Sequence, residues 1–289
     1  MLRSGKIDLI HAHWLLPQGL IAALLANSER PRRVPFVVTS HGADLFALRG
    51  SLFAAIKRFV MQRTAMVTVV SEGMRDEALR LGAPVSQLRV EPMGIDLAGR
   101  FRPDPRVQRK RGTLLFVGRL VEKKGLRHLI DALPIVLAVR PEVTLSVVGF
   151  GPELESRKQQ VTSLGVSDHV TFLGAVTQAA LPSLYREASI FIAPFVEASG
   201  GDQEGLGLVT LEALGCGCPV IVSSLPATRS LATACRDVHV VAPGNPALLA
   251  ERILEILGQP PPEHIDGIED YDWGLRAAAY ARLFHSVLS

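Results

Sequence analysis

Cysteine is scarce in this sequence, and the few that occur form no recognisable framework. The three are Cys216, Cys218 and Cys235, an odd number without the spacing of a disulfide-rich secreted domain. We therefore expect reduced thiols in a cytoplasmic protein. Cys216 and Cys218 lack a second pair or nearby histidines, so we interpret them as small core residues rather than as metal ligands.

Long apolar runs are absent too, although 48% of the 289 residues are apolar. No stretch reaches about 18 apolar residues, so the sequence predicts no membrane-spanning helix. Residues 1–13 reach a charge at Asp8 and lack both the apolar core and the small-residue cleavage site of a signal peptide. We therefore expect a cytoplasmic protein, whose length suggests two domains.

Acidic residues are few in the first part of the chain. Residues 1–110 hold 17 Lys and Arg against 9 Asp and Glu, whereas residues 111–289 hold 14 against 19. A basic half attracts anionic lipid, nucleic acid or phosphorylated substrates, although ordinary surface variation is an alternative explanation.

Short apolar runs alternate with amphipathic stretches, which predicts parallel sheets covered by helices on both faces. In the first part the expected strands are residues 7–13, 34–41, 65–71 and 88–94, and the helices between them are 19–29, 52–64 and 72–82. Residues 97–112 have two prolines and no apolar period, which is typical of a linker. In the second part the expected strands are residues 113–118, 143–149, 169–174, 189–195 and 219–223, again separated by helices.

This order predicts an α/β fold with two Rossmann-like doubly wound domains, residues 1–108 and 109–270, followed by a C-terminal segment at 271–289. A doubly wound domain normally has five or six strands. Residues 1–96 supply about four, and no βα unit precedes the first. The expectation is an N-terminal domain that is incomplete at its start.

Ligands of open α/β sheets bind beyond the carboxyl ends of the strands. Gly118, Arg119 and Lys124 follow the first strand of the second part. The forked guanidinium and the lysine ammonium suit a diphosphate, although a solvated loop with surface charges is an alternative.

Gly149 and Gly151 follow the next strand, where glycine lets a ligand approach the backbone. A tight turn explains this pair equally well.

Glu204 and Glu212 are separated by seven residues. Eight residues of α-helix turn through about 800°, so two carboxylates of one helix would point to different places. We therefore expect Glu204 in a loop and a helix that begins near Gly207. The amides left free at this helix start are those of Gly205, Leu206, Gly207 and Leu208, and they favour an anion.

Glu212, in the second turn among apolar neighbours, needs a partner, which the hydroxyls of a ribose would supply. Alternatively, Glu204 is an ordinary helix-start acid and Glu212 a surface residue.

Histidines lie at two strand ends, with His41 after one predicted strand and His11 and His13 at the end of another. Three such residues together favour a site. Satisfied structural histidines are the alternative.

Together these residues resemble the retaining glycosyltransferases of family 4, which have the two-domain GT-B fold. The similar segments are HAHWLLPQGL, SHGADLF, VVSEGMRDEALRLG, VEPMGIDLAGRF, FVGRLVEKKGL, VVGFGPE, VTFLGAV and EGLGLVTLEALGCGCPVIVS. They cover nearly the whole chain, and the combination of Arg119 and Lys124 with the Glu-x7-Glu element is a specific signature. Residues 271–288 resemble the terminal helix that returns to the first domain.

The resemblance implies a UDP- or GDP-linked sugar as donor, with no metal ion and no further cofactor. Arg119 and Lys124 would neutralise its diphosphate and stabilise the leaving group. Glu212 would bind the ribose, Glu204 and the neighbouring amides would hold the sugar and phosphate, and His41 would contact the transferred sugar. Gly118, Gly149 and Gly151 would line the donor site, and His13 and Trp14 would lie on the acceptor side.

The sequence departs from the family pattern in two places. Gly207 stands where the family usually has a proline, which makes a looser helix start. The family's first strand and its glycine-rich loop have no counterpart, so we expect a truncated product or one piece of a split enzyme. A chain that only binds nucleotide or a partner is therefore the alternative to a catalyst.

The acceptor side has one further signal, an amphipathic segment at residues 51–63. Its apolar residues are Leu52, Phe53, Ile56, Phe59 and Val60, with Lys57, Arg58 and Arg63 beside them. Such a helix binds an anionic membrane surface, although a core-facing helix is the alternative. With the basic residues 29–33, it suits a peripheral enzyme on the inner face of the plasma membrane.

The acceptor that we expect is a glycan or a lipid-linked glycan of bacterial exopolysaccharide, capsule or lipopolysaccharide synthesis, and we expect no nucleic acid partner. Two other enzyme classes are disfavoured. A dehydrogenase would need G-x-G-x-x-G with an acid about 20 residues on. A phosphorylase would need a cofactor-lysine motif, and neither occurs.

Overall fold

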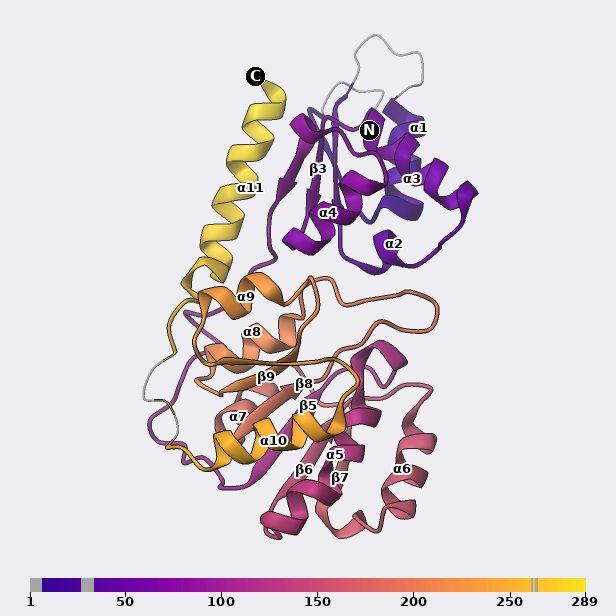
Figure 1. Cartoon of the computed structure of the whole chain (residues 1–289). Coiled ribbons are helices and arrows are strands. Elements are labelled where there is room, and N and C mark those ends of the chain that lie inside the picture. Colours follow the sequence, from indigo (N-terminus) through magenta and orange to yellow (C-terminus); the bar gives the residue numbers. More distant parts are fainter. Residues whose placement is uncertain (1–6, 27–33, 261, 263–264) are drawn as a thin grey trace. The chain divides into compact units, whose positions relative to one another are not determined.

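The structure is a computed structural model that describes residues 7–26, 34–260, 262 and 265–289. The basic segment at residues 29–33 lies outside the described residues. Contacts divide the chain into two compact units, each built around a parallel sheet (Figure 1). Unit 1 takes the described residues up to Gly94 together with Gly200–Leu206 and Trp273–Ser289, and unit 2 takes Ile95–Ser199 and Gly207–Asp272. The domain boundaries at 108 and 270 stay a prediction.

Unit 1 contains a four-stranded parallel sheet whose strands follow one another in sequence order. The strands are β1 (Ile10–His13), β2 (Phe36–Ser40), β3 (Met66–Val69) and β4 (Leu88–Val90). The helices of this unit are α1 (Leu20–Ala26), α2 (Ala43–Phe46), α3 (Ser51–Arg63), α4 (Glu72–Arg80) and α11 (Trp273–Leu288). Every residue of β2 is buried, which explains its continuous apolar run.

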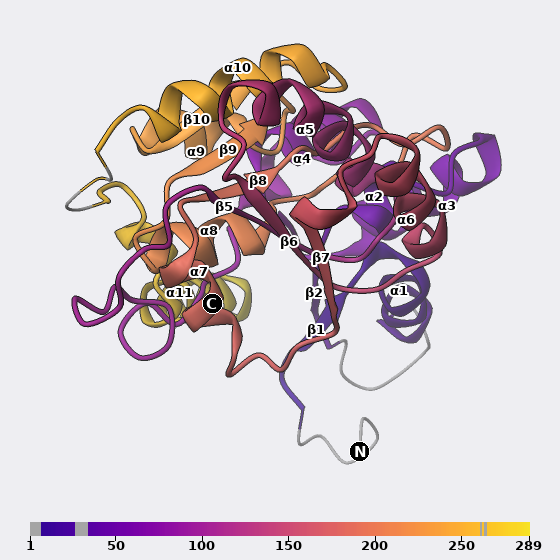
Figure 2. The same ribbon diagram turned by 90° about the horizontal axis from the view of Figure 1, so that it is seen from below.

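Unit 2 contains a six-stranded parallel sheet in the order β10-β9-β8-β5-β6-β7. The strands are β5 (Thr113–Val117), β6 (Thr144–Val148), β7 (Val170–Gly174), β8 (Ile190–Ala193), β9 (Val220–Ser223) and β10 (Val238–Val241). The helices are α5 (Leu126–Val139), α6 (Leu154–Ser163), α7 (Leu181–Glu187), α8 (Leu208–Gly215), α9 (Arg229–Ala234) and α10 (Pro246–Leu257). Figure 2 shows α5 and α10 on one face of the sheet and α7 and α8 on the other. The predicted α/β class with two parallel sheets is confirmed.

The strand order of unit 2 reverses at one point of the sheet. From β5 the chain adds β6 and β7 on one side, then returns to add β8, β9 and β10 on the other. The direction of winding therefore reverses between the neighbouring strands β5 and β8. Sheets of this kind bind ligands at that point.

Two elements of unit 2 are missing from the sequence prediction. The sixth strand, β10, has only four residues, and its sequence VHVV includes a polar histidine. The short helix α9 spans six residues, less than two turns. Segments this short carry too few apolar positions to reveal a period, so tertiary packing decides their conformation.

The predicted linker is coil, but it is packed. Phe101 is buried against the ring of Tyr185 in α7, with 6.3 Å between centroids. The Arg186 side chain donates hydrogen bonds to the carbonyl oxygens of Arg100 and Arg102. The segment after Ile95 is therefore fixed against the helices of unit 2.

The three cysteines are confirmed as core residues, because Cys216, Cys218 and Cys235 are all buried. Burial raises the pKa of Cys216 and of Cys218 to about 12, so both thiols are protonated at neutral pH.

Candidate functional site

The carboxyl ends of β5 and β8 bring a cation and a helix start to one aromatic ring. Lys124 ends the short 3-10 helix Glu122–Lys124 after β5, and its ammonium lies 4.8 Å from the centroid of Phe195. Phe195 follows β8 and also touches the start of α8, since a Cβ on Gly207 would lie 2.9 Å from the ring. Lys124 and the amino end of α8 therefore flank the same buried side chain at the strand-order reversal.

A close approach of two loops fixes the position of Lys124. Gly125 adopts a left-handed conformation, and a Cβ there would lie 1.7 Å from the carbonyl oxygen of Pro194. The amide of Val196 donates a hydrogen bond of 3.0 Å to the carbonyl oxygen of Lys123. Only glycine permits this contact, so the Lys-Lys-Gly turn is held against the loop that follows β8.

The remaining glycines of the predicted donor site have a packing role. A Cβ on Gly149 would lie 1.8 Å from the carbonyl oxygen of Gly118, and one on Gly151 would lie 2.3 Å from that of Leu120. The amide of Gly118 bonds to the carbonyl oxygen of Val148. Two neighbouring loops therefore need these glycines to pack, and their contact with a donor stays a prediction, as does that of Arg119.

Glu204 and Glu212 lie in different local structures, as the helical geometry predicted. Glu204 is in coil, and α8 begins at Leu208 after Gly207, whose φ of 76° is left-handed. Proline cannot adopt this conformation because its ring fixes φ near −65°. Gly207 at the family's proline position thus allows a different entry into the helix.

The amino end of α8 keeps unused donors. Among the described residues, no acceptor bonds the backbone amides of Gly205, Leu206, Gly207 and Leu208. Gly207 directly precedes α8 and Leu208 is its first residue, a position where free amides and the helix dipole favour an anion.

Glu212 is buried in α8, with 7% of its surface exposed, and it has a protein partner that the sequence argument missed. The phenol of Tyr185 donates a hydrogen bond of 2.9 Å to the Glu212 carboxylate. This is the only hydrogen bond to that carboxylate within the described part of the chain. The tyrosine therefore holds the carboxylate in place, and the contact of Glu212 with a ribose stays a prediction. The signal was the aromatic Tyr185 in the amphipathic helix before β8.

The environment of this pair perturbs both groups. Burial raises the pKa of Glu212, while the Tyr185 hydrogen bond and the charge of Arg100 lower it in part. Burial and the adjacent carboxylate raise the pKa of Tyr185 well above 10. Tyr185 is therefore the fixed donor and Glu212 the acceptor, whose ionised form gains from every further donor.

The three histidines of unit 1 divide into two groups. His13 Nδ1 and His41 Nε2 lie 2.8 Å apart, so one ring donates to the other. His11 instead bonds to Thr39, and its ring packs against Tyr280 and Phe284 of α11. His11 is therefore the structural histidine of the three, while the exposed His13 and the half-buried His41 form a separate pair.

Burial and neighbouring charges lower the pKa of His11 and of His41. Burial lowers the pKa of His41, with His13 as the next cause. The pKa of His11 falls to about 4 through burial, then through His13 and His41. A neutral His41 both donates and accepts hydrogen bonds.

Asp44 is a second residue that the sequence argument passed over. Its carboxylate is 2% exposed and accepts hydrogen bonds from the amides of Leu15, His41 and Gly42, at 2.7, 3.0 and 3.2 Å. It therefore ties the end of β1 to the end of β2. The signal was available in SHGAD, where an acid three residues after a strand-end histidine is an ordinary loop cap.

Trp14 lies beside the histidine pair. It is 40% exposed, has a φ of 78°, and its indole ring lies 6.0 Å from that of His41 between centroids. A left-handed tryptophan is strained. The amide of Trp14 is held by the carbonyl oxygen of Thr39 at 2.7 Å.

Comparison with known proteins identifies the family of this chain. The model of the glycosyl transferases group 1 matches residues 99–267, more than half of the sequence. The chain belongs to this family. A second model, the glycosyl transferase 4-like domain, matches residues 1–94. The predicted recognition as a family 4 glycosyltransferase is confirmed.

Two of the curated relatives of this glycosyltransferase are named as phosphatidylinositol-type mannosyltransferases. A GDP-mannose-dependent alpha-(1-6)-phosphatidylinositol monomannoside mannosyltransferase of Mycobacterium tuberculosis is 35% identical over 224 residues, 72% of this chain and 56% of that protein. The phosphatidyl-myo-inositol mannosyltransferase of Mycobacterium leprae is 29% identical over 98% of this chain and 75% of its own length. The match to the first relative thus spans little more than half of that protein.

Solved structures confirm the fold. Sucrose-phosphate synthase from Thermosynechococcus elongatus superposes with a TM-score of 0.81 at 21% identity, over 97% of this chain and 73% of that one. Anabaena HepE in complex with UDP gives 0.78 at 20% identity, over 96% and 79%. Over the described residues, none of the helices is both long and apolar enough to cross a membrane.

Proposed function

We propose that this glycosyltransferase moves a hexosyl group, with retention, from a nucleotide-diphosphate sugar to a lipid-linked or glycan acceptor. The observation that carries the proposal is the arrangement around Phe195. It holds the ammonium of Lys124 and the free amides before α8 at the strand-order reversal of unit 2. A cation beside a helix start is suited to a phosphate group.

The proposed chemistry assigns this end of the sheet to the leaving group. The bond between the sugar C1 and the diphosphate oxygen breaks, a bond from C1 to the acceptor oxygen forms on the same face, and the acceptor proton passes to a phosphate oxygen. Lys124, Arg119 and the amides before α8 stabilise the negative charge that develops on the diphosphate. Glu212, held by Tyr185, accepts hydrogen bonds from the ribose hydroxyls.

Glu204 and His41 are proposed to act on the sugar itself. The carboxylate of Glu204 accepts hydrogen bonds from sugar hydroxyls. His41 is suited to the same task, because burial lowers its pKa and so favours a neutral ring that donates without carrying charge. The hydrogen bond with His13 fixes the direction of the His41 ring.

The names of the relatives suggest which nucleotide sugar and which acceptor to test first. One mycobacterial relative is named as a GDP-mannose-dependent phosphatidylinositol monomannoside mannosyltransferase, and the other as a phosphatidyl-myo-inositol mannosyltransferase. GDP-mannose and a phosphatidylinositol-type lipid are therefore the first donor and acceptor to test, with UDP-glucose as the comparison.

The test is calorimetric titration of the chain with GDP and UDP, then release of nucleotide from the matching sugar donor with and without lipid acceptor. Saturable binding and acceptor-dependent release support the proposal. Binding without release identifies a chain that only holds nucleotide, and absence of binding by both nucleotides refutes the donor site.

A membrane surface is proposed as the place where the acceptor is met, with the enzyme peripheral on the cytoplasmic face. Ile21 and Leu24 of α1 and Leu52 of α3 are more than half exposed, and these two helices pack together. In contrast, Val60 and Lys57 are buried, so the C-terminal half of the predicted apolar face of α3 belongs to the core.

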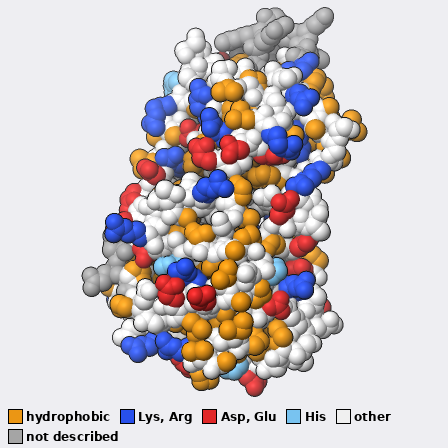
Figure 3. Space-filling view, in the orientation of Figure 1, with side chains coloured by type: hydrophobic (Ala, Val, Ile, Leu, Met, Phe, Trp, Pro, Cys, Tyr) orange, Lys and Arg blue, Asp and Glu red, His pale blue; other side chains and the backbone are white. Residues whose placement is uncertain are grey.

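Figure 3 shows Lys and Arg side chains spread among Asp and Glu on the face that it draws, without a single basic patch. The exposed apolar side chains of α1 and α3 are therefore the part of the proposed membrane contact to test first. Sedimentation with anionic and neutral vesicles tests this, because Leu24→Ser with Leu52→Ser should release the chain. Unchanged sedimentation of the double variant would contradict the membrane contact.

A further inference from the structure

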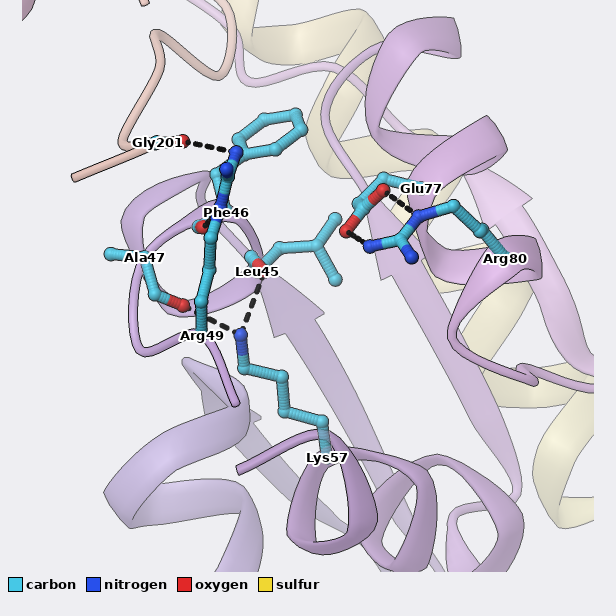
Figure 4. Close-up of polar contacts among 8 residues, drawn as sticks. All are labelled: Leu45, Phe46, Ala47, Arg49, Lys57, Glu77, Arg80 and Gly201. Carbon is cyan, nitrogen blue, oxygen red and sulfur yellow. Dashed lines mark hydrogen bonds and ion pairs between the residues drawn. The ribbon is translucent and has the colours of Figure 1, made fainter. Parts of the chain in front are cut away.

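The segment between α2 and α3 contacts the loop that contains Glu204. Arg49 donates hydrogen bonds to the carbonyl oxygens of Phe46, at 3.4 Å, and of Gly201, at 3.1 Å (Figure 4). Gly201 has a φ of 77°, and a Cβ there would lie 1.9 Å from the central carbon of the Arg49 guanidinium. The flat guanidinium therefore packs directly against the backbone of Gly201, where only glycine leaves room.

A buried lysine holds the segment that carries Arg49. Lys57 of α3 is 2% exposed, and its ammonium donates hydrogen bonds of 2.7 Å to the carbonyl oxygens of both Leu45 and Ala47. Figure 4 shows this side chain reaching from α3 to the end of α2. Burial lowers the pKa of Lys57, and the charges of Asp44 and Glu77 offset this in part. The two carbonyl groups thus fix the segment from which Arg49 extends.

The other end of the same loop is also held. A Cβ on Gly205 would lie 2.5 Å from the carbonyl oxygen of His41, and one on Gly42 would lie 3.0 Å from the Cα of Gly205. The loop Gly200–Leu206 is therefore tied at Gly201 by Arg49 and at Gly205 by the backbone after β2. Glu204 lies between the two ties.

We propose that Arg49 is a positioning residue for Glu204, and that Lys57 sets the position of Arg49. The chain of contacts runs from α3 through Lys57 to the end of α2, through Arg49 to Gly201, and along three residues of backbone to Glu204. The benefit to catalysis rests on the proposed function, in which Glu204 holds the donor sugar. The nucleotide-binding groups Lys124 and Glu212 belong to unit 2 and are not part of these contacts.

The first test is Arg49→Ala in the full chain, with Arg89→Ala as the matched control. Arg89 also donates to two backbone carbonyl oxygens of unit 1, those of Ser86 and Leu88, but it touches neither the loop nor the site. A misplacement of about 1 Å costs on the order of 100-fold in rate, so Arg49→Ala should lower kcat about 10- to 100-fold. The affinity for free nucleotide should stay within about twofold, and Arg89→Ala should change neither quantity.

A mutant cycle with Gly201 separates positioning from a general loss of structure. Gly201→Ala introduces the clash with the guanidinium, so it should reduce kcat strongly when Arg49 is present. In the Arg49→Ala background the clash is gone, and the second substitution should cost only a small further factor from the left-handed backbone. Losses that simply multiply would overturn the proposal, since independent sites are additive in free energy.

A measurement that needs no enzymatic assay tests the positioning role separately from the proposed function. Amide hydrogen exchange of residues 202–204, between the two contacts of the loop, should accelerate in Arg49→Ala and, to a lesser degree, in Lys57→Met, but not in Arg89→Ala. Unchanged exchange in Arg49→Ala would refute the positioning role even if the chain is an active transferase. Faster exchange in a chain that binds no nucleotide would support the tie to Gly201 and reject only the donor site.

Discussion

The hydrogen bond from Tyr185 to Glu212 gives the sharpest energetic prediction. Tyr185→Phe keeps the ring that packs against Phe101 and Phe191 but removes the O–H that donates to a buried carboxylate. Hydrogen bonds to charged groups contribute about 1.5–3 kcal/mol, and Glu212 has no other donor among the described residues. We therefore expect the free energy of unfolding at pH 7 to fall by about 1.5–3 kcal/mol.

The pH dependence of this loss follows from the direction of the shift. The pKa of Glu212 in the folded state lies above its ordinary value of 4.5, chiefly through burial. The group therefore costs stability when it is ionised, and that cost disappears as the pH falls through the raised pKa. Because Tyr185 mainly supports the ionised form, the effect of Tyr185→Phe should be full at pH 7 and should shrink on acidification. The substitution should also raise the pKa of Glu212 further.

Urea unfolding of the wild type, Tyr185→Phe, Glu212→Met and the double variant at pH 7 measures the coupling of the two side chains, because methionine keeps the length of the side chain without an oxygen acceptor. We expect a coupling energy of about 1.5–3 kcal/mol. NMR of labelled glutamate should show a further rise in the pKa of Glu212 in Tyr185→Phe. A coupling below about 0.5 kcal/mol, within the usual error of additivity, would refute the reasoning.

Three further predictions concern the site and its support. Glu212→Ala should weaken nucleotide binding in calorimetry, whereas Glu204→Ala should mainly reduce turnover with the sugar donor; equal, small effects would contradict these roles. Gly207→Ala should cost about 1–2 kcal/mol of unfolding free energy for its left-handed backbone, and an unchanged melting temperature would exclude that conformation. The lowered pKa of His11 means that its contribution to stability is complete above pH 6.5 and is lost as the pH falls towards 4. His11→Gln should flatten this part of the melting-temperature profile, and a parallel profile would point to another group.

Part of this site was predictable because it depends on local geometry. The division of Glu204 and Glu212 between loop and helix follows from the helical turn per residue, and the start of α8 at Leu208 agrees with it. The alternation of strands and helices is equally local, so only the shortest elements, such as β10, escaped it. The family was recognisable for the same reason, since its signature lies in short segments with fixed spacing.

The residues that contact Glu212 and the loop of Glu204 could not be predicted from local sequence. Tyr185 and Glu212 are 27 positions apart, and Arg49 and Gly201 are 152 apart. Lys57 looked like part of a basic surface, yet it is buried against two carbonyl groups. Each of these residues belongs to a type that is common on protein surfaces, and nothing in the neighbouring sequence distinguishes a buried partner from a solvated one.

The sequence by itself determined the class of fold and the family, and it predicted the residues of the proposed donor site, because periodicity and motif spacing are properties of short segments. Only the tertiary structure decided which side chains hold that site in place. Crossovers between strands bring Phe195 to Lys124, Tyr185 to Glu212 and Arg49 to Gly201. Those contacts depend on how distant segments pack. Burying a polar side chain costs free energy unless a partner forms a hydrogen bond with it, and only the folded chain supplies that partner.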